Sequence, residues 1–254
     1  ASLFTQGMVT HQTFQDADGK WLSPEQVTRS GDIWTIAETG APATAGRIER
    51  MSKSKKNVVD PDDIVDQYGA DAVRWFMLSD SPPERDLEWS EAGIEGCWRF
   101  VQRLWRLTGQ VSGAEGEDKA LLRKTHQAIS GVGADIEALS FNKAVAKIYD
   151  LANAIEKASP SASRDAAIKT ILLLSAPMVP HLAEEAWTKL GAGLIADASW
   201  PDVDPALLVE DEVTIAIQVQ GKLRDTLTVA KGLGQDDMQA LALASQKVQH
   251  AIGD

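Results

Sequence analysis

The sequence predicts a mainly α-helical fold, with short strands and loops before a helical bundle and a small α/β module after it. From Ser90 onward, apolar residues recur at helical spacing for about a hundred residues, which is typical of a bundle. The first 59 residues instead hold only short apolar runs among many Gly, Thr and Asp. Near Trp200 the period of the apolar residues changes to two, which indicates strands.

The strand-and-loop region runs from Ala1 to about Val59, and apolar runs such as 33–36 are expected to form its strands. A helix is predicted to begin at Pro61, because Asp60 is a favoured N-cap and Pro fits the first helical position. Gly69 is expected to end this helix after Tyr68, and a second helix is predicted from position 70.

The bundle follows a break at Ser81-Pro82-Pro83. Gly, Ser, Asn or Pro residues interrupt the helical pattern between its segments. The predicted helices cover 91–111, 119–139, 141–158, 162–176 and 180–190.

The last region is predicted to be a hairpin covered by a helix. Apolar residues alternate with polar ones over 213–219 and continue over 223–229, which indicates two strands. We expect Gly221-Lys222 to form a two-residue turn, with Gly in the first central position. One helix, 236–251, is expected to pack on one face of this hairpin.

Composition limits the class of protein. The chain of 254 residues is 44% hydrophobic and has a formal net charge of -12, so a packed core is feasible and wholesale wrapping of a polyanion is not. Its most apolar stretch, 171–174, is far shorter than the roughly 20 residues that span a bilayer. The single cysteine, Cys97, excludes an internal disulfide and suits a reducing compartment. We therefore expect a cytoplasmic protein with no membrane partner.

Two further features follow from simple counts. The four histidines have no Cys or His neighbours at ligand spacing, so no metal site is predicted. The chain begins at Ala1 without a start methionine and enters an apolar run directly, which suggests a piece of a longer protein.

One short stretch is strongly basic in this acidic chain. Residues 47–56 contain five Lys or Arg and one acid, which gives a charge of +4. The ammonium of Lys53, the hydroxyls of Ser52 and Ser54, and backbone amides could together hold a phosphate group. Such groups would also stabilise the charge that develops on a leaving pyrophosphate. On composition alone, a solvated basic turn is the commoner explanation of such a run.

Longer stretches around this turn resemble a known family. Residues 50–57, with Asp60-Pro61 and 68–74, resemble the Lys-Met-Ser-Lys-Ser signature and following segment of class I aminoacyl-tRNA synthetases. We call residues 50–57 the signature loop. Within that class, residues 86–96 with Arg99-Phe100 are most similar to leucyl-tRNA synthetases of bacterial type. Residues 177–185 look like the late-bundle segment of this subclass, and 219–224 like the start of its C-terminal module, so the likeness covers nearly the whole chain.

The resemblance implies leucine-tRNA ligase activity for the intact protein: ATP, with Mg²⁺, activates leucine as leucyl-adenylate, and the leucyl group then passes to tRNA(Leu). It implies catalytic roles for Lys53, Ser52 and Ser54, and contacts with ATP for Lys53, Arg50 and Met51. Arg50 stands where the family usually has Lys, and its planar guanidinium has a different reach. No cofactor is expected to stay tightly bound to this segment.

The resemblance also implies parts that would precede Ala1. The family's His-Ile-Gly-His signature, its first nucleotide-binding half and its inserted editing domain are absent from these residues. We therefore expect that this segment alone neither activates leucine nor charges tRNA, and that the intact enzyme is a monomer.

Two basic patches are candidates for tRNA contact. Arg99, Arg103 and Arg106 fall on one face of the helix predicted from Glu91. A solvated helix face explains this stripe equally well. Lys222 and Arg224 lie near the hairpin tip, in a module that the resemblance implies contacts the body of the tRNA.

Other conspicuous side chains are expected to be structural. Trp75, Trp98, Trp105 and Trp187 fall within helical apolar patterns and are predicted to pack in the core. His181 precedes an apolar helix and is predicted to be a hydrogen-bonded structural residue rather than a general base.

The resemblance divides the chain into three expected domains. These are the end of the catalytic domain with the signature loop and following helices (1–89), a helical bundle of the anticodon-binding type (90–198), and a truncated C-terminal α/β module (199–254). The alternatives are a free-standing tRNA-binding module without catalysis, the same part of an isoleucyl- or valyl-tRNA synthetase, and a bundle that serves as a protein-interaction scaffold. Measurable tRNA affinity would argue against the scaffold.

Overall fold

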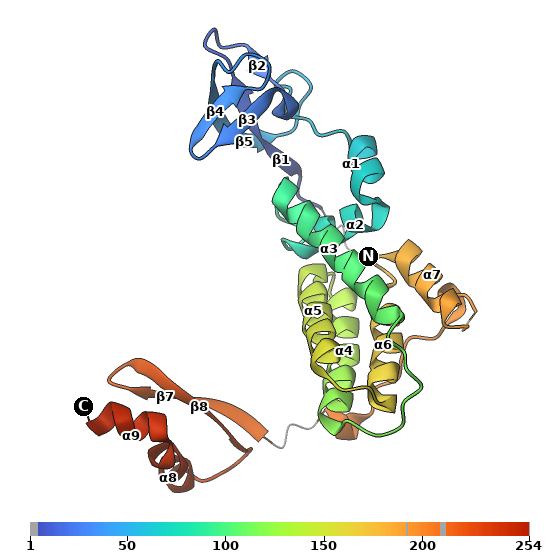
Figure 1. Cartoon of the computed structure of the whole chain (residues 1–254), viewed down its shortest axis with the longest axis vertical. Helices are drawn as coiled ribbons and strands as arrows, with labels where there is room; N and C mark the ends of the chain where they lie inside the picture. Colours follow the sequence, from blue (N-terminus) through green and yellow to red (C-terminus); the bar gives the residue numbers. More distant parts are fainter. Residues whose placement is uncertain (1–4, 192, 209–211, 254) are drawn as a thin grey trace. The chain divides into compact units, whose positions relative to one another are not determined.

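The computed structural model describes residues 5–191, 193–208 and 212–253, and it forms two compact units, Ala1–Val203 and Asp204–Asp254. The first unit holds a small sheet, two linking helices and a helical bundle, and the second holds a hairpin with two helices (Figure 1). The prediction of a mainly α-helical fold with a small amount of strand is confirmed.

The sheet is built around the antiparallel pair β1 (Val9–Gln15) and β5 (Pro42–Arg50). Its strand order is β2-β1-β5-β4-β3, where β2 is Trp21–Leu22, β3 is Val27–Ser30 and β4 is Ile33–Ile36. The ring of Phe14, which is buried, lies 4.6 Å from that of Trp34. A short strand, β6 (Leu87–Glu88), pairs in parallel with β1 and so returns the chain to the sheet before the bundle.

Two helices lead from the sheet to the bundle, as predicted. They are α1 (Pro61–Tyr68) and α2 (Ala70–Ser79). The carboxylate of Asp60 accepts a hydrogen bond from the amide of Asp62 at 3.0 Å, which is the expected N-cap. Gly69 separates the helices with a φ of 85°, a left-handed value that glycine adopts without strain.

The bundle consists of the predicted helices with shorter ends, and α4, α5 and α6 run side by side in it (Figure 1). Its members are α3 (Glu91–Thr108), α4 (Lys119–Glu137), α5 (Phe141–Lys157), α6 (Ala162–Ser175) and α7 (Pro180–Lys189), and a 3₁₀ turn, η2 (Ile195–Asp197), follows.

The first bundle helix ends at Thr108, three residues before the predicted end at Val111. Side chains of α6 explain the difference, because they bind the chain where the helix would continue. The carboxylate of Asp165 accepts hydrogen bonds from the amides of Ser112 at 3.1 Å and Gly113 at 2.7 Å. Local sequence does not reveal such a long-range partner.

The core runs from α2 through the bundle. Trp75 is fully buried, stacks on Phe100 at 4.9 Å between ring centroids, and donates its indole N–H to the hydroxyl of Tyr149 at 3.1 Å. Trp105 and Trp187 are partly buried against this core, as expected. The prediction for Trp98 is wrong, because this side chain is 38% exposed.

The second unit contains η3 (Pro205–Leu207), β7 (Glu212–Val219), β8 (Lys222–Ala230), α8 (Gln235–Ala244) and α9 (Gln246–Gly253). The hairpin is confirmed, but its turn is Gln220-Gly221, since Val219 pairs with Lys222. Both turn residues have positive φ, 52° and 77°, so the glycine takes the second central position.

The single helix predicted over 236–251 is in fact two helices. They are separated at Ser245, whose φ of -66° and ψ of 126° are extended. The Ser245 hydroxyl donates to the carboxylate of Asp225 on β8 at 2.5 Å, and Lys247 pairs with the same carboxylate at 2.9 Å. These side-chain contacts hold the extended residue between α8 and α9 against β8.

Candidate functional site

The signature loop lies between the end of β5 and the start of α1. It begins at Arg50, the last residue of β5, which pairs with Thr10 of β1. The chain then makes a tight turn, in which the amide of Lys55 donates to the carbonyl of Ser52 at 3.2 Å and that of Lys56 to Lys53 at 3.3 Å. Lys56 has a φ of 56°, which a non-glycine residue rarely adopts.

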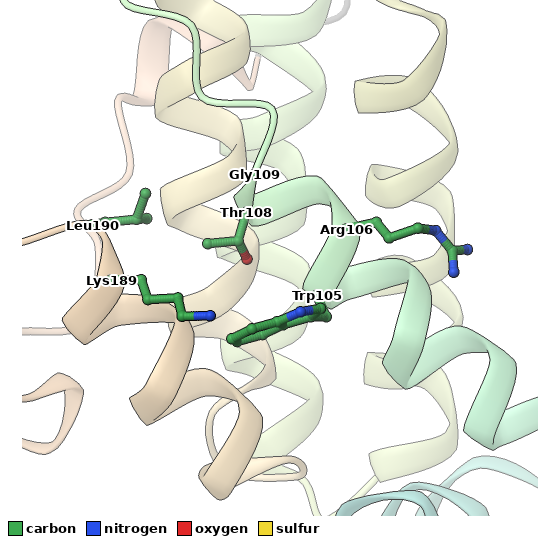
Figure 2. A pocket seen from close by; sticks show the side chains of 6 residues that line it. All are labelled: Trp105, Arg106, Thr108, Gly109, Lys189 and Leu190. Carbon is green, nitrogen blue, oxygen red and sulfur yellow. The ribbon is translucent and has the colours of Figure 1, made fainter.

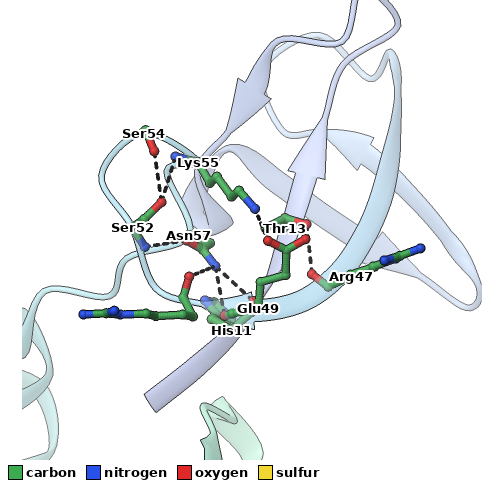
Figure 3. A network of polar contacts seen from close by, with 9 residues as sticks. His11, Thr13, Arg47, Glu49, Ser52, Ser54, Lys55 and Asn57 are labelled. Atoms are coloured by element: carbon green, nitrogen blue, oxygen red, sulfur yellow. Dashed lines mark hydrogen bonds and ion pairs between the residues drawn. The ribbon is translucent and has the colours of Figure 1, made fainter. Parts of the chain in front are cut away.

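The side-chain amide of Asn57 holds the two ends of this turn together (Figure 3). Asn57 is fully buried. Its Oδ1 accepts a hydrogen bond from the Ser52 amide at 2.9 Å. Its Nδ2 lies 3.1 Å from the carbonyl oxygen of His11, 3.3 Å from that of Glu49 and 3.4 Å from that of Arg50. Because unpaired polar groups are costly inside a protein, this satisfied amide fixes the loop against β1 and β5.

Two of the polar side chains in the loop bond to neighbours within it. The hydroxyls of Ser52 and Ser54 lie 3.1 Å apart, and the Lys55 amide donates to the Ser52 hydroxyl at 3.3 Å. The ammonium of Lys55 forms an ion pair with Glu49 of β5 (Figure 3). Lys55 is therefore committed to the strand beneath the loop.

The side chains of Lys53 and Arg50 are exposed. Among the residues that the structure describes, neither forms an ion pair. Lys53 therefore presents its ammonium to solvent at the outer part of a loop whose base is fixed by Asn57.

Met51 has a different environment from its neighbours in the signature. It is partly buried against the apolar core and lines an apolar cavity of about 270 Å³ behind the loop. Residues of β1, α1 and α2 complete the lining, among them Val9, Ile64 and Val73. Met51 thus joins the loop to the helices that follow it, and its contact with ATP stays a prediction.

His11 lies beneath the loop, and its pKa is lowered. Burial, which penalises the charged imidazolium, is the main cause, and the backbone of Asn57 and the carboxylates of Glu91 and Glu88 oppose it. Its Nδ1 is buried and finds no hydrogen-bond partner among the described residues. Burial therefore favours the neutral imidazole of His11 over the charged form.

The predicted arginine stripe on α3 is largely engaged by carboxylates of the same chain. Arg99 pairs with Glu95 at 2.8 Å. Arg103 makes a bidentate pair with Glu156 of α5, at 2.7 and 2.9 Å, and also donates to Asn153 at 2.7 Å. The Arg103 side chain is only 20% exposed, so it first serves to join α3 to α5.

The third arginine of the stripe has no such partner. Arg106 is exposed and forms no ion pair within the described part of the chain. It borders a cavity of about 360 Å³ between the ends of α3 and α7, where the ammonium of Lys189 lies 3.8 Å from the centre of the Trp105 ring. Figure 2 shows Lys189 reaching toward Trp105, while the guanidinium of Arg106 points away from both.

The two cations of the hairpin are also exposed. Lys222 is the first residue of β8, and Arg224 lies where the pairing with β7 shifts between Ile217 and Gln218. An irregularity of this kind turns a side chain out of the regular alternation of the strand.

Sequence reasoning singled out the exposed cations but missed the residues that support them. Asn57 drew no attention beyond its membership of the signature motif, and one of its hydrogen-bond partners is the distant carbonyl of His11. Asp71 and Arg74 belong to the family-like segment after the loop, which gave them no role, yet Asp71 binds the first turn of α7 and Arg74 binds the connection before it. Lys189 carried no local signal at all, because its partner Trp105 lies on another helix.

Two other kinds of site have no counterpart in the described part of the chain. Within residues 5–191, 193–208 and 212–253, no group of three or more His, Cys, Asp or Glu side chains is placed to hold a metal ion. Nor does any helix within the same residues have the length and apolar character needed to cross a membrane.

Comparison with family models places two known domains on the chain. Residues 42–90 match the model described as tRNA synthetases class I (I, L, M and V), which covers β5, the signature loop and the linking helices. Residues 118–238 match the anticodon-binding domain of tRNA ligase.

Individual relatives agree with these models. The chain is 68% identical to the leucine-tRNA ligase of Rhizorhabdus wittichii and 65% identical to that of Novosphingobium aromaticivorans, over 98% and 99% of its own length. It spans 30% of the length of each of these curated relatives.

A solved structure agrees as well. The match is to a ternary complex from Agrobacterium radiobacter described as LeuRS-tRNA-LeuAMS, with a TM-score of 0.65 and 27% identity over 100% of this chain and 30% of that one. The signature loop, the family models and these relatives lead to one conclusion: the chain belongs to the leucyl-tRNA synthetase family of class I aminoacyl-tRNA synthetases.

Proposed function

We propose that this chain is part of a leucine-tRNA ligase, which uses ATP to attach leucine to tRNA(Leu) through leucyl-adenylate. One observation carries the proposal: Asn57 fixes the base of the signature loop while the ammonium of Lys53 remains exposed above it. The names of the relatives, and the tRNA and LeuAMS in the similar ternary complex, support the same activity.

In this proposal Lys53 acts on the triphosphate of ATP. Its flexible side chain would approach the phosphates as pyrophosphate leaves, and the Ser52 and Ser54 hydroxyls would donate hydrogen bonds beside it. Stabilisation that arises only as charge develops lowers the barrier rather than merely tightening binding. Arg50, at the start of the loop, would add a second positive charge, and Mg²⁺ bound to ATP would neutralise the rest.

We further propose that the domains are those expected from the sequence: 1–89, 90–198 and 199–254. The first would supply half of the adenylate site, and the other two would bind tRNA. The upstream half of the site would come from the longer protein, which we propose is a cytoplasmic monomer.

The exposed cations of the bundle and the hairpin are the main candidates for contact with tRNA phosphates. Arg106, Lys222 and Arg224 are exposed, whereas Arg99 and Arg103 are paired with carboxylates. A phosphate would have to displace Glu156 from Arg103, and leaving that carboxylate without its partner is costly. Lys189, near Arg106 at the end of the bundle, is an added candidate.

Amino-acid dependence of the full-length enzyme tests the proposed activity. Exchange of labelled pyrophosphate into ATP should depend on leucine and be far weaker with isoleucine or valine. Exchange that is fastest with isoleucine or valine would assign the protein to one of those ligases instead.

Binding of tRNA(Leu) to the chain tests the second part of the proposal. Arg106→Ala should weaken binding and reduce the slope of log K against log salt by roughly 0.7 to 0.9, as expected for one lost phosphate contact. Lys20→Ala, which removes an exposed cation from the connection between β1 and β2, is the control. Equal affinity and slope in the two variants would remove Arg106 from the interface.

A further inference from the structure

The helix that follows the signature loop is joined to the bundle by a buried carboxylate. Asp71, in the first turn of α2, is 8% exposed. Its Oδ2 accepts a hydrogen bond from the Leu182 amide at 2.6 Å, and its Oδ1 lies 2.8 Å from Nδ1 of His181. The amide of His181 also donates to Oδ1 at 3.4 Å. Asp71 therefore caps the start of α7 from another helix, where backbone amides lack partners.

One turn further along α2, Arg74 binds the other side of the same corner. Its Nε donates to the carbonyl of Met178 at 3.1 Å, and its Nη2 donates to that of Pro177 at 2.9 Å. These carbonyls lie in the short connection between α6 and α7, where no helix supplies their donors. Because Asp71 and Arg74 are three residues apart, they lie on one face of α2 and bind the corner together.

The corner that they bind is itself packed into the bundle core. Met178 and Val179 are both fully buried in the bundle core. On the other side, Val73 and Met77 of α2 line the same apolar cavity as Met51 of the signature loop. The loop and α2 therefore border one apolar cavity, and Asp71 and Arg74 attach α2 to the α6–α7 corner.

We propose that Asp71 and Arg74 are positioning residues for the signature loop, which set its place relative to the bundle by fixing α2 to the α6–α7 corner. The proposal rests on the function given above, since the position of Lys53 matters only if the loop acts on ATP. Neither residue touches the substrate in this proposal, and their effect reaches the reaction through the placement of the loop.

The test uses leucine-dependent pyrophosphate exchange by the full-length enzyme. Asp71→Asn and Arg74→Met are compared with Asp66→Asn, which changes an exposed carboxylate of α1. Because misplacement of a reacting group by about 1 Å can cost up to about 100-fold, kcat should fall at least tenfold in both test variants. The KM for leucine should stay within about twofold of the wild-type value, because neither variant removes a group that binds leucine in the ground state. Asp66→Asn should match the wild type.

A second readout separates positioning from simple loss of stability. In the chain itself, both test variants should speed hydrogen exchange at the amides of Ser52, Lys55 and Lys56, which form the turn of the loop. If Arg74→Met unfolds the bundle, Arg74→Lys is used in its place. Lysine can donate to one of the two carbonyls, so kcat should fall by an intermediate amount.

The outcomes distinguish this inference from the proposed function. Variants with a lowered melting temperature, but with kcat and loop exchange equal to those of Asp66→Asn, would overturn the positioning role and leave the function standing. A wild-type enzyme without leucine-dependent exchange would overturn the proposed function itself.

Discussion

At the scale of single residues, the signature loop depends on one buried amide. Asn57 makes four hydrogen-bond contacts with backbone groups of the loop, β5 and β1, and all of them are at least five positions away in sequence. The charged residues that draw attention in the sequence lie above it. Fixed geometry at the base lets Lys53 keep a mobile side chain without losing the position of its backbone.

Replacement of Asn57 should therefore destabilise the loop. Asn57→Ala leaves the Ser52 amide without its acceptor, and we expect the free energy of unfolding to fall by about 1–3 kcal/mol. Urea unfolding of the chain measures this loss, with Gln67→Ala on the exposed side of α1 as control.

A matched variant separates the two halves of the amide. Asn57→Asp keeps an acceptor for Ser52 but places a carboxylate against the carbonyls of His11, Glu49 and Arg50, so the loss should be larger than for alanine. Stability of Asn57→Asp equal to that of the wild type would contradict this account of the loop.

The sequence predicts which cations belong to the site, but it does not show which side chains pair with them. Lys53 followed from charge and motif, and its exposure agrees with a chemical role. The sequence could not show that Arg103 is paired, because Glu156 lies 53 positions away on another helix. Trp98 was assigned to the core from periodicity alone, yet it lies at the edge of the apolar face.

At the scale of elements, local signals located the helices and distant contacts set their ends. The N-cap Asp60 and the glycine at position 69 defined α1 correctly, because both act on the helix they adjoin. The end of α3 depends on Asp165 of α6, and the break between α8 and α9 depends on Asp225 of β8. Helix ends of this kind can be predicted only when the fold is known.

The carboxylate of Asp225, which binds the break between α8 and α9, should make the stability of the second unit depend on pH. The pKa of Asp225 is lowered from 3.8 to about 2, chiefly by the hydrogen bond from Ser245 and then by Lys247 and the amide of Thr226. Because the folded pKa is below the unfolded one, the carboxylate stabilises the second unit above pH 3.8. That contribution is lost as the pH falls through about 2.

Titration of the Asp225 carboxyl by NMR tests this cause. Ser245→Ala should raise its pKa toward 3.8, and Lys247→Met should raise it by less. A pKa near 2 that persists in Ser245→Ala would mean that the hydroxyl does not hold the carboxylate.

At the scale of the whole molecule, the chain contains only part of the proposed active site. It spans 30% of the length of its relatives, and the family's His-Ile-Gly-His signature does not occur among these residues. We therefore expect the isolated chain to bind tRNA without catalysing pyrophosphate exchange. Exchange by the isolated chain above that of its Lys53→Ala variant would contradict this expectation.

The order of the parts was predictable from sequence, and the link between them was not. Periodicity distinguished strands, bundle and hairpin, and the motifs identified the family. The attachment of α2 to the α6–α7 corner joins residues more than 100 positions apart, so only the fold could reveal it.

Leucine-dependent pyrophosphate exchange by the full-length enzyme with Lys53→Ala shows whether the ammonium of the signature loop acts in adenylate formation. Loss of one group that stabilises developing charge costs about 10²–10³ in rate, so kcat should fall by about 100-fold or more while the melting temperature stays unchanged. Lys20→Ala, which removes an exposed cation elsewhere in the sheet region, should retain the wild-type rate. A Lys53→Ala enzyme that exchanges pyrophosphate as fast as Lys20→Ala would show that this ammonium takes no part in adenylate formation.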